Sequence, residues 1–245
     1  MLLRMPTSVS EAQECMSEGA VPIGGATLVW AIWQRDGFPE LAMTLRELPE
    51  ANALGDGVLG SAVLLSRIDE RVPEVLRRAA ATVGTGAVRR TATVGGNLVG
   101  STLRCLLPPA LALDARATVL ERDRVFETDL AEVLDKRHLL LSIHWPEPVV
   151  SGYHKSPAEE GGAPPLVVAA AVHADGAGPG TLRVAVRDGY EVLSESTPIA
   201  DGTAGVLGAL RGTAVGALHP EAWDTVERLV TEVLDRPGAQ RANGS

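Results

Sequence analysis

The sequence predicts an α+β chain of three consecutive pieces, residues 1–52, 53–148 and 149–245. Two glycine pairs, each placed between a short apolar strand and a following helix, organise the first two pieces. A segment rich in Gly, Pro and Glu, 156–165, breaks the composition before two strands and two helices. Because strands precede helices in the third piece, we expect an antiparallel sheet with helices on one face.

Composition indicates a globular protein with a hydrophobic core of its own. The 245 residues are 45% hydrophobic and carry a net charge of −9, so neither disorder nor general nucleic-acid binding is expected. No apolar run approaches the roughly 20 residues that span a bilayer, and Cys15 and Cys105 cannot form a disulfide scaffold. With no cationic and apolar leader before Met5, these features predict a cytoplasmic protein that binds no membrane.

The first piece is predicted to open with a helix that begins after the candidate cap Ser8 and ends near Ser17, before Gly19. A strand from Val21 then enters the first glycine turn and a helix leaves it. Residues 41–48 are expected to form a strand and a helical turn.

The second and third pieces alternate between short strands and short helices, as apolar periods of two and 3.6 residues indicate. In the second piece we expect strands at 57–62, 117–121 and 139–145 and helices at 65–71, 73–83, 108–113 and 128–134. In the third we expect a hairpin of strands at 166–173 and 181–188, helices at 204–210 and 220–234, and a frayed tail over 236–245.

The first glycine turn, Ile23-Gly24-Gly25-Ala26-Thr27, has the composition of an anion cradle. Adjacent glycines let the backbone turn its N–H groups toward one point, and the free amides at the start of a following helix face the same way. Such a concavity suits a phosphate, and Thr27 adds a hydroxyl donor.

The second turn, Thr93-Val94-Gly95-Gly96-Asn97, has the same ingredients, and Asn97 offers both a donor and an acceptor. Two such turns would grip the two halves of one pyrophosphate. A Gly-Gly pair is more often only a turn, however, and neither sequence matches the three spaced glycines of a dinucleotide fingerprint or the lysine-bearing P-loop. Local chemistry alone therefore leaves phosphate binding and plain turns open.

The two turns are more specific together, since they precede Leu107-Pro108-Pro109-Ala110-Leu111 and Leu113-Asp114-Ala115. In this order the chain resembles the FAD-binding domain of molybdopterin dehydrogenases, the flavoprotein or medium subunit of enzymes of the carbon monoxide dehydrogenase and xanthine dehydrogenase type. The resemblance covers residues 1–150 well and the rest more loosely, through Tyr153-His154-Lys155. It implies a PCMH-type fold, in which two FAD-binding subdomains precede a smaller C-terminal subdomain of antiparallel sheet and helices.

The resemblance also implies how a cofactor is held. FAD would bind noncovalently, with its pyrophosphate between the two turns and its ribityl and adenosine part along Ser101 and Thr102. Lys155 matches a lysine that lies near the flavin ring in some members, where a cation would stabilise the reduced flavin; a solvated lysine is an equal alternative. The expected cofactor-binding residues are Ile23, Gly24, Gly25, Ala26, Thr27, Thr93, Gly95, Gly96, Asn97, Ser101 and Thr102.

The chain departs from the family pattern at three places. The first turn usually reads Ala-Gly-Gly-Thr followed by Asp, Ser or Asn, whereas here Ala26 replaces the second glycine and Leu28 the polar residue. An alanine is expected to fit there only if its φ stays negative. Leu106 replaces an Asp expected to contact the cofactor, and 156–165 replaces an arginine-rich segment. These departures bear on flavin-ring chemistry and partner contacts rather than on the pyrophosphate cradle.

Three functions follow, in order of preference. The first is the electron-transfer medium subunit of a molybdenum hydroxylase, an FAD-dependent oxidoreductase with a molybdopterin large subunit and an iron–sulfur small subunit as partners. The second is a stand-alone FAD-dependent enzyme that oxidises or rearranges a small-molecule substrate, and the third is a non-catalytic protein that retains the fold.

Other candidate residues are given structural roles. The five histidines are scattered, so no metal site is expected, and no catalytic base is supported by spacing. Cys105 is interpreted as a buried thiol rather than a redox group, and Trp30 and Trp33 are expected in the core or an interface.

Overall fold

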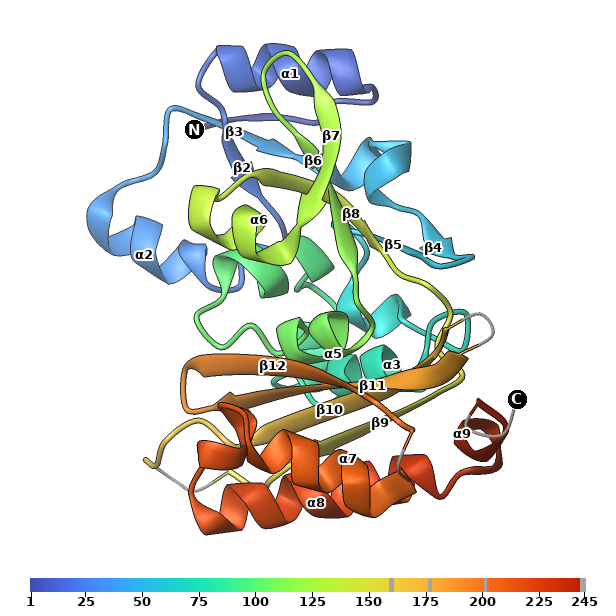
Figure 1. Cartoon of the computed structure of the whole chain (residues 1–245). Helices are drawn as coiled ribbons and strands as arrows, with labels where there is room; N and C mark the ends of the chain where they lie inside the picture. The colour runs from blue at the N-terminus through green and yellow to red at the C-terminus, as the bar shows by residue number, and fades with distance from the viewer. Residues whose placement is uncertain (159–160, 176–177, 201, 243–245) are drawn as a thin grey trace. The chain divides into compact units, whose positions relative to one another are not determined.

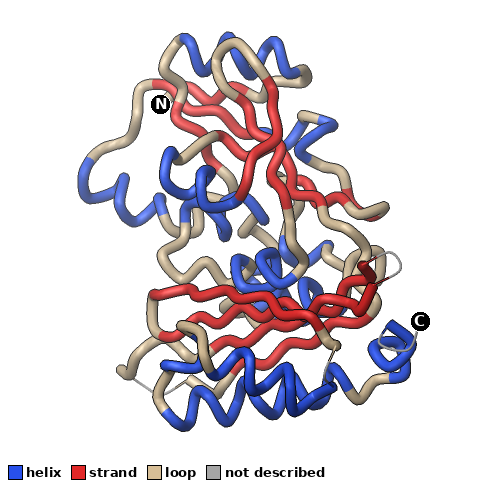
Figure 2. Tube along the Cα trace, viewed as in Figure 1, coloured by secondary structure: helices blue, strands red, loops and turns tan. Residues whose placement is uncertain are grey.

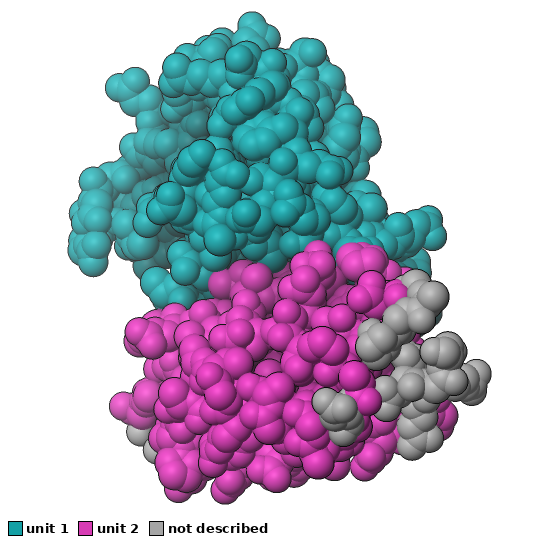
Figure 3. Space-filling model, in the orientation of Figure 1, with its two compact units in different colours: residues 1–72, 80–104, 115–145 teal, residues 73–79, 105–114, 146–245 magenta. Residues whose placement is uncertain are grey.

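The structure, a computed structural model, describes residues 1–158, 161–175, 178–200 and 202–242 (Figure 1). Two compact units make up the chain: one comprises residues 1–72, 80–104 and 115–145, and the other comprises 73–79, 105–114 and 146–245 (Figure 3). Each unit is built from helices and sheets, as expected for an α+β chain (Figure 2). The subdomain boundaries at residues 52 and 148 stay a prediction.

The first unit begins with a small parallel sheet of order β1-β3-β2. The helix α1 has the predicted start and end, because the Ser8 hydroxyl accepts a hydrogen bond from the Glu11 amide at 3.3 Å and buried Ala12 packs into the core. The bounds are β1 Leu2–Arg4, α1 Val9–Ser17, β2 Val21–Ile23, α2 Val29–Asp36 and β3 Leu41–Thr44, followed by the 3₁₀ turns η1 Leu45–Glu47 and η2 Pro49–Ala51.

The same unit contains a five-stranded antiparallel sheet of order β4-β5-β8-β6-β7. Asp129 caps the helix that follows β7 by accepting a hydrogen bond from the Glu132 amide at 2.7 Å. The strands are β4 Leu54–Gly55, β5 Val58–Gly60, β6 Arg116–Leu120, β7 Val125–Asp129 and β8 Leu139–His144, and the capped helix is α6 Leu130–Lys136.

Short helices connect these strands, and the second glycine turn lies among them. They are η3 Leu65–Arg67, α3 Glu74–Ala81, α4 Gly86–Arg89, the π-helical segment η4 Gly96–Gly100 and α5 Leu107–Ala112. The predicted helices at 73–83 and 108–113 are thereby confirmed within two residues at each end.

The second unit is built on a four-stranded antiparallel sheet of order β12-β11-β10-β9. Helices α7 and α8 cover one of its faces, where Val168, Val184 and Trp223 share a buried core (Figure 1). The helices of the third predicted piece therefore lie on one face of its antiparallel sheet, as expected, while α5, from the second predicted piece, contacts β10, β11 and β12. The bounds are β9 Val150–Lys155, β10 Val167–Asp175, β11 Gly178–Asp188, β12 Glu191–Pro198, α7 Gly202–Arg211, η5 Val215–Ala217 and α8 Pro220–Leu234.

The C-terminal tail is more ordered than the sequence indicated. A further helix, α9 Pro237–Ala242, follows α8, and its Ala239 is 2% exposed. The prediction of a frayed tail is therefore wrong over 237–242, and residues 243–245 lie outside the described residues.

Candidate functional site

Both glycine turns belong to the first unit, and they touch each other. The strand β2 ends at Ile23 and α2 begins at Val29, so the first turn occupies the expected position between strand and helix. A β-carbon added at Gly24 would overlap the Thr93 hydroxyl, and one added at Gly25 would overlap the main-chain carbonyl of Thr91. The absence of side chains at these two residues is what lets the turns approach so closely.

The first turn contains an alanine in the left-handed region. Ala26 has a φ of +55°, so the expectation that its φ would stay negative is wrong. This conformation crowds the alanine β-carbon against its own backbone and costs about 1–2 kcal/mol. Ala26 therefore adopts the backbone that a glycine would adopt, and the departure from the family pattern at this residue does not straighten the turn.

The amides of the first turn are available to an acceptor. Within the described residues, the N–H groups of Gly24, Gly25, Ala26 and Thr27 donate no main-chain hydrogen bond. Leu28, the N-cap residue of α2, has no side-chain hydrogen bond to the helix start, whereas Ser, Asp or Asn in its place could accept one from the amides of the first helical turn. The turn is at least partly open to solvent, so it presents a set of donors that suits an anion.

The second turn uses its amides internally. The Gly95 amide donates to the Ser61 carbonyl at 2.8 Å, the Asn97 amide to the Thr93 carbonyl at 3.0 Å, and the Gly96 amide to the Thr93 hydroxyl at 3.2 Å. A β-carbon at Gly95 would lie 2.9 Å from that of Ser61. The free main-chain donors are thus concentrated in the first turn. The second turn, whose amides are already hydrogen-bonded, packs against it.

Sequence reasoning missed the part that Ser61 and Thr91 play in holding these turns. Ser61 is 5% exposed and fixes Gly95, while the carbonyl of Thr91 faces Gly25. The motif Gly60-Ser61-Ala62 supports the family resemblance, but only the folded chain shows which of its atoms meets the second turn.

The other predicted site residues lie farther along the chain. Ser101 accepts a hydrogen bond from the Leu103 amide at 3.2 Å and is half-buried, and Thr102 is exposed. Lys155 lies in the second unit, at the end of β9, where it pairs with Val167. Burial, and after it the Arg228 and Arg78 cations, lowers the pKa of the neighbouring His154.

Two of the departures from the family pattern have opposite environments. Leu106 is completely buried at the start of α5, so an apolar side chain fills this place in the second unit. Leu28 is 51% exposed. The segment 156–165 contains no helix or strand among its described residues, and Glu159 and Glu160 lie outside them.

A family comparison decides what this arrangement is. Residues 3–148 match the model of the FAD binding domain in molybdopterin dehydrogenase. The chain belongs to this family. The match spans both glycine turns and ends close to the boundary predicted at residue 148, so the turns with their exposed donors lie within an FAD-binding domain.

Solved structures similar to this molybdopterin dehydrogenase domain share its fold. Quinoline 2-oxidoreductase from Pseudomonas putida 86 has a TM-score of 0.68 at 17% identity, with 98% of this chain and 97% of that chain covered. Cyanide-inactivated Cu,Mo-CO dehydrogenase has a TM-score of 0.73 at 15% identity, with 97% of both chains covered. Carbon monoxide dehydrogenase from Hydrogenophaga pseudoflava, lacking the Mo-pyranopterin moiety, has 0.70 at 16%, covering 98% and 97%.

No curated protein matches the chain in sequence. The structural likeness extends over nearly the whole chain and identifies the fold as that of these oxidoreductase chains. Within the described ranges, no group of three or more His, Cys, Asp or Glu side chains is placed to hold a metal ion. None of the helices described in the structure has the length and hydropathy to cross a membrane.

Proposed function

We propose that this chain is the electron-transfer medium subunit of a molybdenum hydroxylase, with FAD bound noncovalently at the first glycine turn. The observation that carries this proposal is the row of main-chain amides at Gly24, Gly25, Ala26 and Thr27 that have no main-chain acceptor within the described residues. It supports a pyrophosphate at this turn, because pyrophosphate oxygens are strong acceptors for converging N–H groups. When bound, FAD supplies the isoalloxazine ring that carries electrons.

In this proposal the chain's own residues bind and orient the cofactor. The amides of the first turn hold the pyrophosphate, and the Thr27 hydroxyl adds a donor at the exposed edge. The Thr93 hydroxyl accepts the Gly96 amide at 3.2 Å, so its own hydrogen is left for a further acceptor. Ser101 and Thr102 are assigned to the ribityl and adenosine part and Lys155 to the flavin ring, following the matched family positions.

Exposed apolar side chains favour a subunit over a stand-alone enzyme. Helix α2 has no buried residue, although it contains Trp30, Ile32 and Trp33. Trp30 is 49% exposed and packs edge-on against the exposed ring of Phe38, with 5.2 Å between ring centroids. Exposed apolar groups of this kind are typical of protein–protein interfaces. This supports the interface reading of the tryptophans and, with the fold, a molybdopterin subunit and an iron–sulfur subunit as partners.

Flavin content tests the cofactor assignment. The full chain, mixed with FAD and FMN together and then freed of unbound flavin by gel filtration, should keep the two absorption bands of a flavin, and acid extraction should release FAD rather than FMN. Release by acid also tests noncovalent binding, since a covalent flavin would stay with the precipitated protein. A chain that binds no FAD would overturn the proposed function.

The site assignment needs a variant that leaves the packing of the turns intact. Gly25→Val or Gly95→Val is unsuitable, because both glycines approach protein atoms, so cofactor loss would follow from misfolding alone. Thr27→Asp instead places a carboxylate on the exposed side of the turn, where it should weaken FAD binding by about tenfold or more through repulsion. The matched control Gln34→Glu adds the same charge at an exposed position of α2 and should leave FAD affinity unchanged.

Metal analysis separates the two enzymatic alternatives. Isolated from its own cells with partners attached, a medium subunit should copurify with stoichiometric molybdenum and iron. A flavin-containing preparation with neither metal would instead support the stand-alone enzyme.

A further inference from the structure

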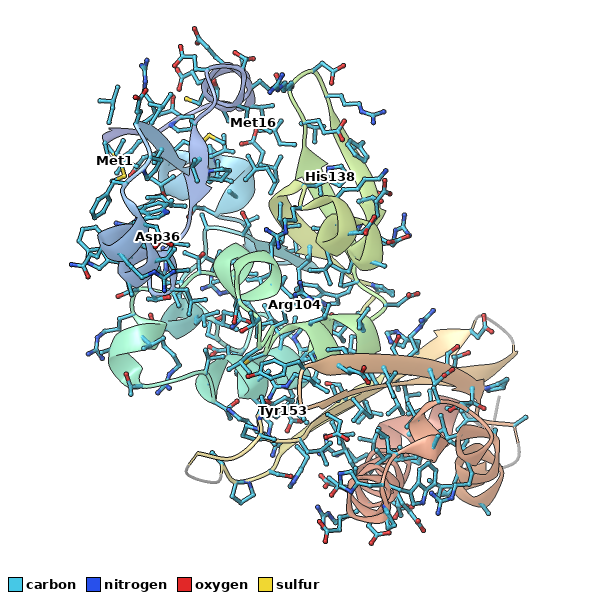
Figure 4. All side chains as sticks on the ribbon, turned by 90° about the vertical axis from the view of Figure 1, so that its left-hand side faces the viewer. Met1, Met16, Asp36, Arg104, His138 and Tyr153 are labelled. Carbon is cyan, nitrogen blue, oxygen red and sulfur yellow. The ribbon has the colours of Figure 1, made fainter. Side chains whose placement is uncertain are left out.

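Arg104 is an unusual arginine in the first unit. It lies in the loop between η4 and α5, has a φ of +41° and is half-buried (Figure 4). Its Nε is completely buried without a hydrogen-bond partner. The structure gives its guanidinium no ion pair with any carboxylate of the described residues.

Such an arrangement is costly unless a ligand completes it. A guanidinium is always charged, and a charged donor withdrawn from water without an acceptor is strongly destabilising. The left-handed backbone of a non-glycine residue adds about 1–2 kcal/mol of strain, and strained residues of this type cluster at ligand-binding sites. Two independent features of Arg104 thus point to a missing anionic partner.

The charge of the surrounding chain points to the same kind of ligand. The protein has a net charge of −9, yet residues 75–113 contain five arginines and no Asp or Glu. Two of these arginines have partners: Arg78 pairs with Glu74 at 3.2 Å, and Arg89 donates to the carbonyls of Val83 and Gly84. The other three are Arg77 and Arg90, which are exposed, and Arg104, which is half-buried.

We infer that Arg104 is an additional cofactor-binding residue, whose guanidinium binds a phosphate oxygen of FAD. The inference rests on the proposed function, since it takes FAD as the ligand of the first unit. A planar guanidinium fork is well suited to two phosphate oxygens at once, and such charge-assisted pairs are about twice as strong as neutral ones. Arg104 follows Ser101 and Thr102 closely in the chain and lies in the same unit as both glycine turns.

The test compares ligands and variants of the full chain by calorimetric titration. Arg104→Gln should weaken binding of FAD and of ADP by roughly ten- to a hundredfold, as expected for loss of a charge-assisted hydrogen bond. It should leave binding of riboflavin, which has no phosphate, unchanged. The affinities of Arg104→Lys for FAD and ADP should lie between those of Arg104→Gln and the wild type, because lysine retains the charge without the planar guanidinium fork.

Arg137→Gln is the matched control. Arg137 is also a non-glycine residue in the left-handed region, with a φ of +54°, but it is exposed at the end of α6. Its replacement should change neither FAD nor ADP affinity. Thermal unfolding without cofactor gives a second readout: Arg104→Gln should melt at the same temperature as the wild type or higher, while FAD should raise its melting temperature less.

The outcomes separate this inference from the proposed function. Wild-type protein that binds FAD, together with an Arg104→Gln variant that binds it equally well, would overturn the inference alone. Weaker riboflavin binding with unchanged ADP binding would place the contact at the flavin ring and overturn the phosphate assignment. A lower melting temperature of the cofactor-free variant would mark Arg104 as a structural residue. Failure of the wild type to bind FAD would overturn the proposed function itself.

Discussion

Gly25 lies so close to the main-chain carbonyl of Thr91 that a β-carbon at residue 25 would overlap it. The neighbouring Gly24 has the same relation to the Thr93 side chain. Sixty-six residues separate Gly25 from Thr91 in the sequence, so this contact is a long-range constraint on the first unit. It explains why a glycine pair is required here independently of any ligand.

The close approach predicts a large effect of a small substitution. Gly25→Ala should destabilise the cofactor-free protein by about 1–3 kcal/mol, the usual cost of overpacking, because a main-chain carbonyl cannot turn aside as a side chain can. Urea unfolding followed by circular dichroism measures this. Gly100→Ala is the control, since a β-carbon there would meet nothing within 4 Å. Equal midpoints for the two variants would contradict the packing of the turns.

The left-handed alanine predicts a stabilising substitution. Ala26→Gly should raise the free energy of unfolding by about 0.5–1 kcal/mol, because relief of the strained φ exceeds the greater freedom of glycine in the unfolded chain. Thermal unfolding is the measurement. Ala31→Gly, at an exposed position inside α2, should instead lose about 1 kcal/mol. If Ala26→Gly is also destabilising, the φ at residue 26 is negative in solution.

Removal of the Thr93 hydroxyl should leave the Gly96 amide less protected from hydrogen exchange. Thr93→Val keeps the side-chain volume but removes the acceptor of the Gly96 amide, which should cost about 1 kcal/mol and speed hydrogen exchange at Gly96. Thr91→Val is the control, because the Thr91 hydroxyl is exposed and only reaches the Ala87 carbonyl at 3.4 Å. Unchanged exchange at Gly96 in Thr93→Val would show that this hydrogen bond does not form.

The Glu132 carboxylate on α6 should make the stability of the folded protein depend on pH. The Lys136 ammonium, 2.5 Å from Glu132, and then the Thr128 hydroxyl lower the pKa of the Glu132 carboxyl from its ordinary 4.5 to about 2. The pKa of Glu132 is lower in the folded protein than in the unfolded chain. The ionised carboxylate therefore stabilises the folded state above pH 4.5, and this contribution is lost as the pH falls toward 2. Carbon-detected NMR titration should give a Glu132 midpoint near 2, and Lys136→Met should move it up toward 4.5. The His138 ring lies beside this carboxylate (Figure 4), with its Nε2 3.8 Å from Glu132 and its Nδ1 3.3 Å from Glu121.

Strong periodicity made the buried elements predictable from the sequence. The helix α8 runs over the predicted residues 220–234 because Trp223, Val226 and Val230 recur on one face and are buried. The strand β10 was predicted because it is apolar on both faces, and β11 because Leu182, Val184 and Val186 alternate with more polar residues. The order of the two glycine turns also indicated the family correctly.

Edge strands were missed for the opposite physical reason. β12 contains Glu191, Ser194 and Glu195 and lies at the edge of its sheet, so its residues are mostly exposed or half-buried and no apolar alternation marks it. β7 is likewise an edge strand, and the helix predicted to start at residue 128 begins only after it, at Leu130.

The candidate site was predictable in its residues but not in its hydrogen bonds. Two glycine pairs and a following helix are visible in a sequence, whereas the pairing of Gly95 with Ser61, or the positive φ at Ala26, depends on long-range packing. The two turns look equivalent in the sequence, but within the described residues the first leaves its amides without a main-chain acceptor, whereas the second uses them in hydrogen bonds.

The second unit is assembled from three stretches of chain, with 73–79 and 105–114 joining the C-terminal residues. Helix α5, with its buried Leu107 and Ala110, packs on β10 and β11. A truncation that begins at residue 149 would therefore leave a row of small apolar side chains, including Ala169 and Ala171, facing water. No single cut in the gene divides this protein into two fragments that each retain their own interior, because stretches of the two units alternate along the chain.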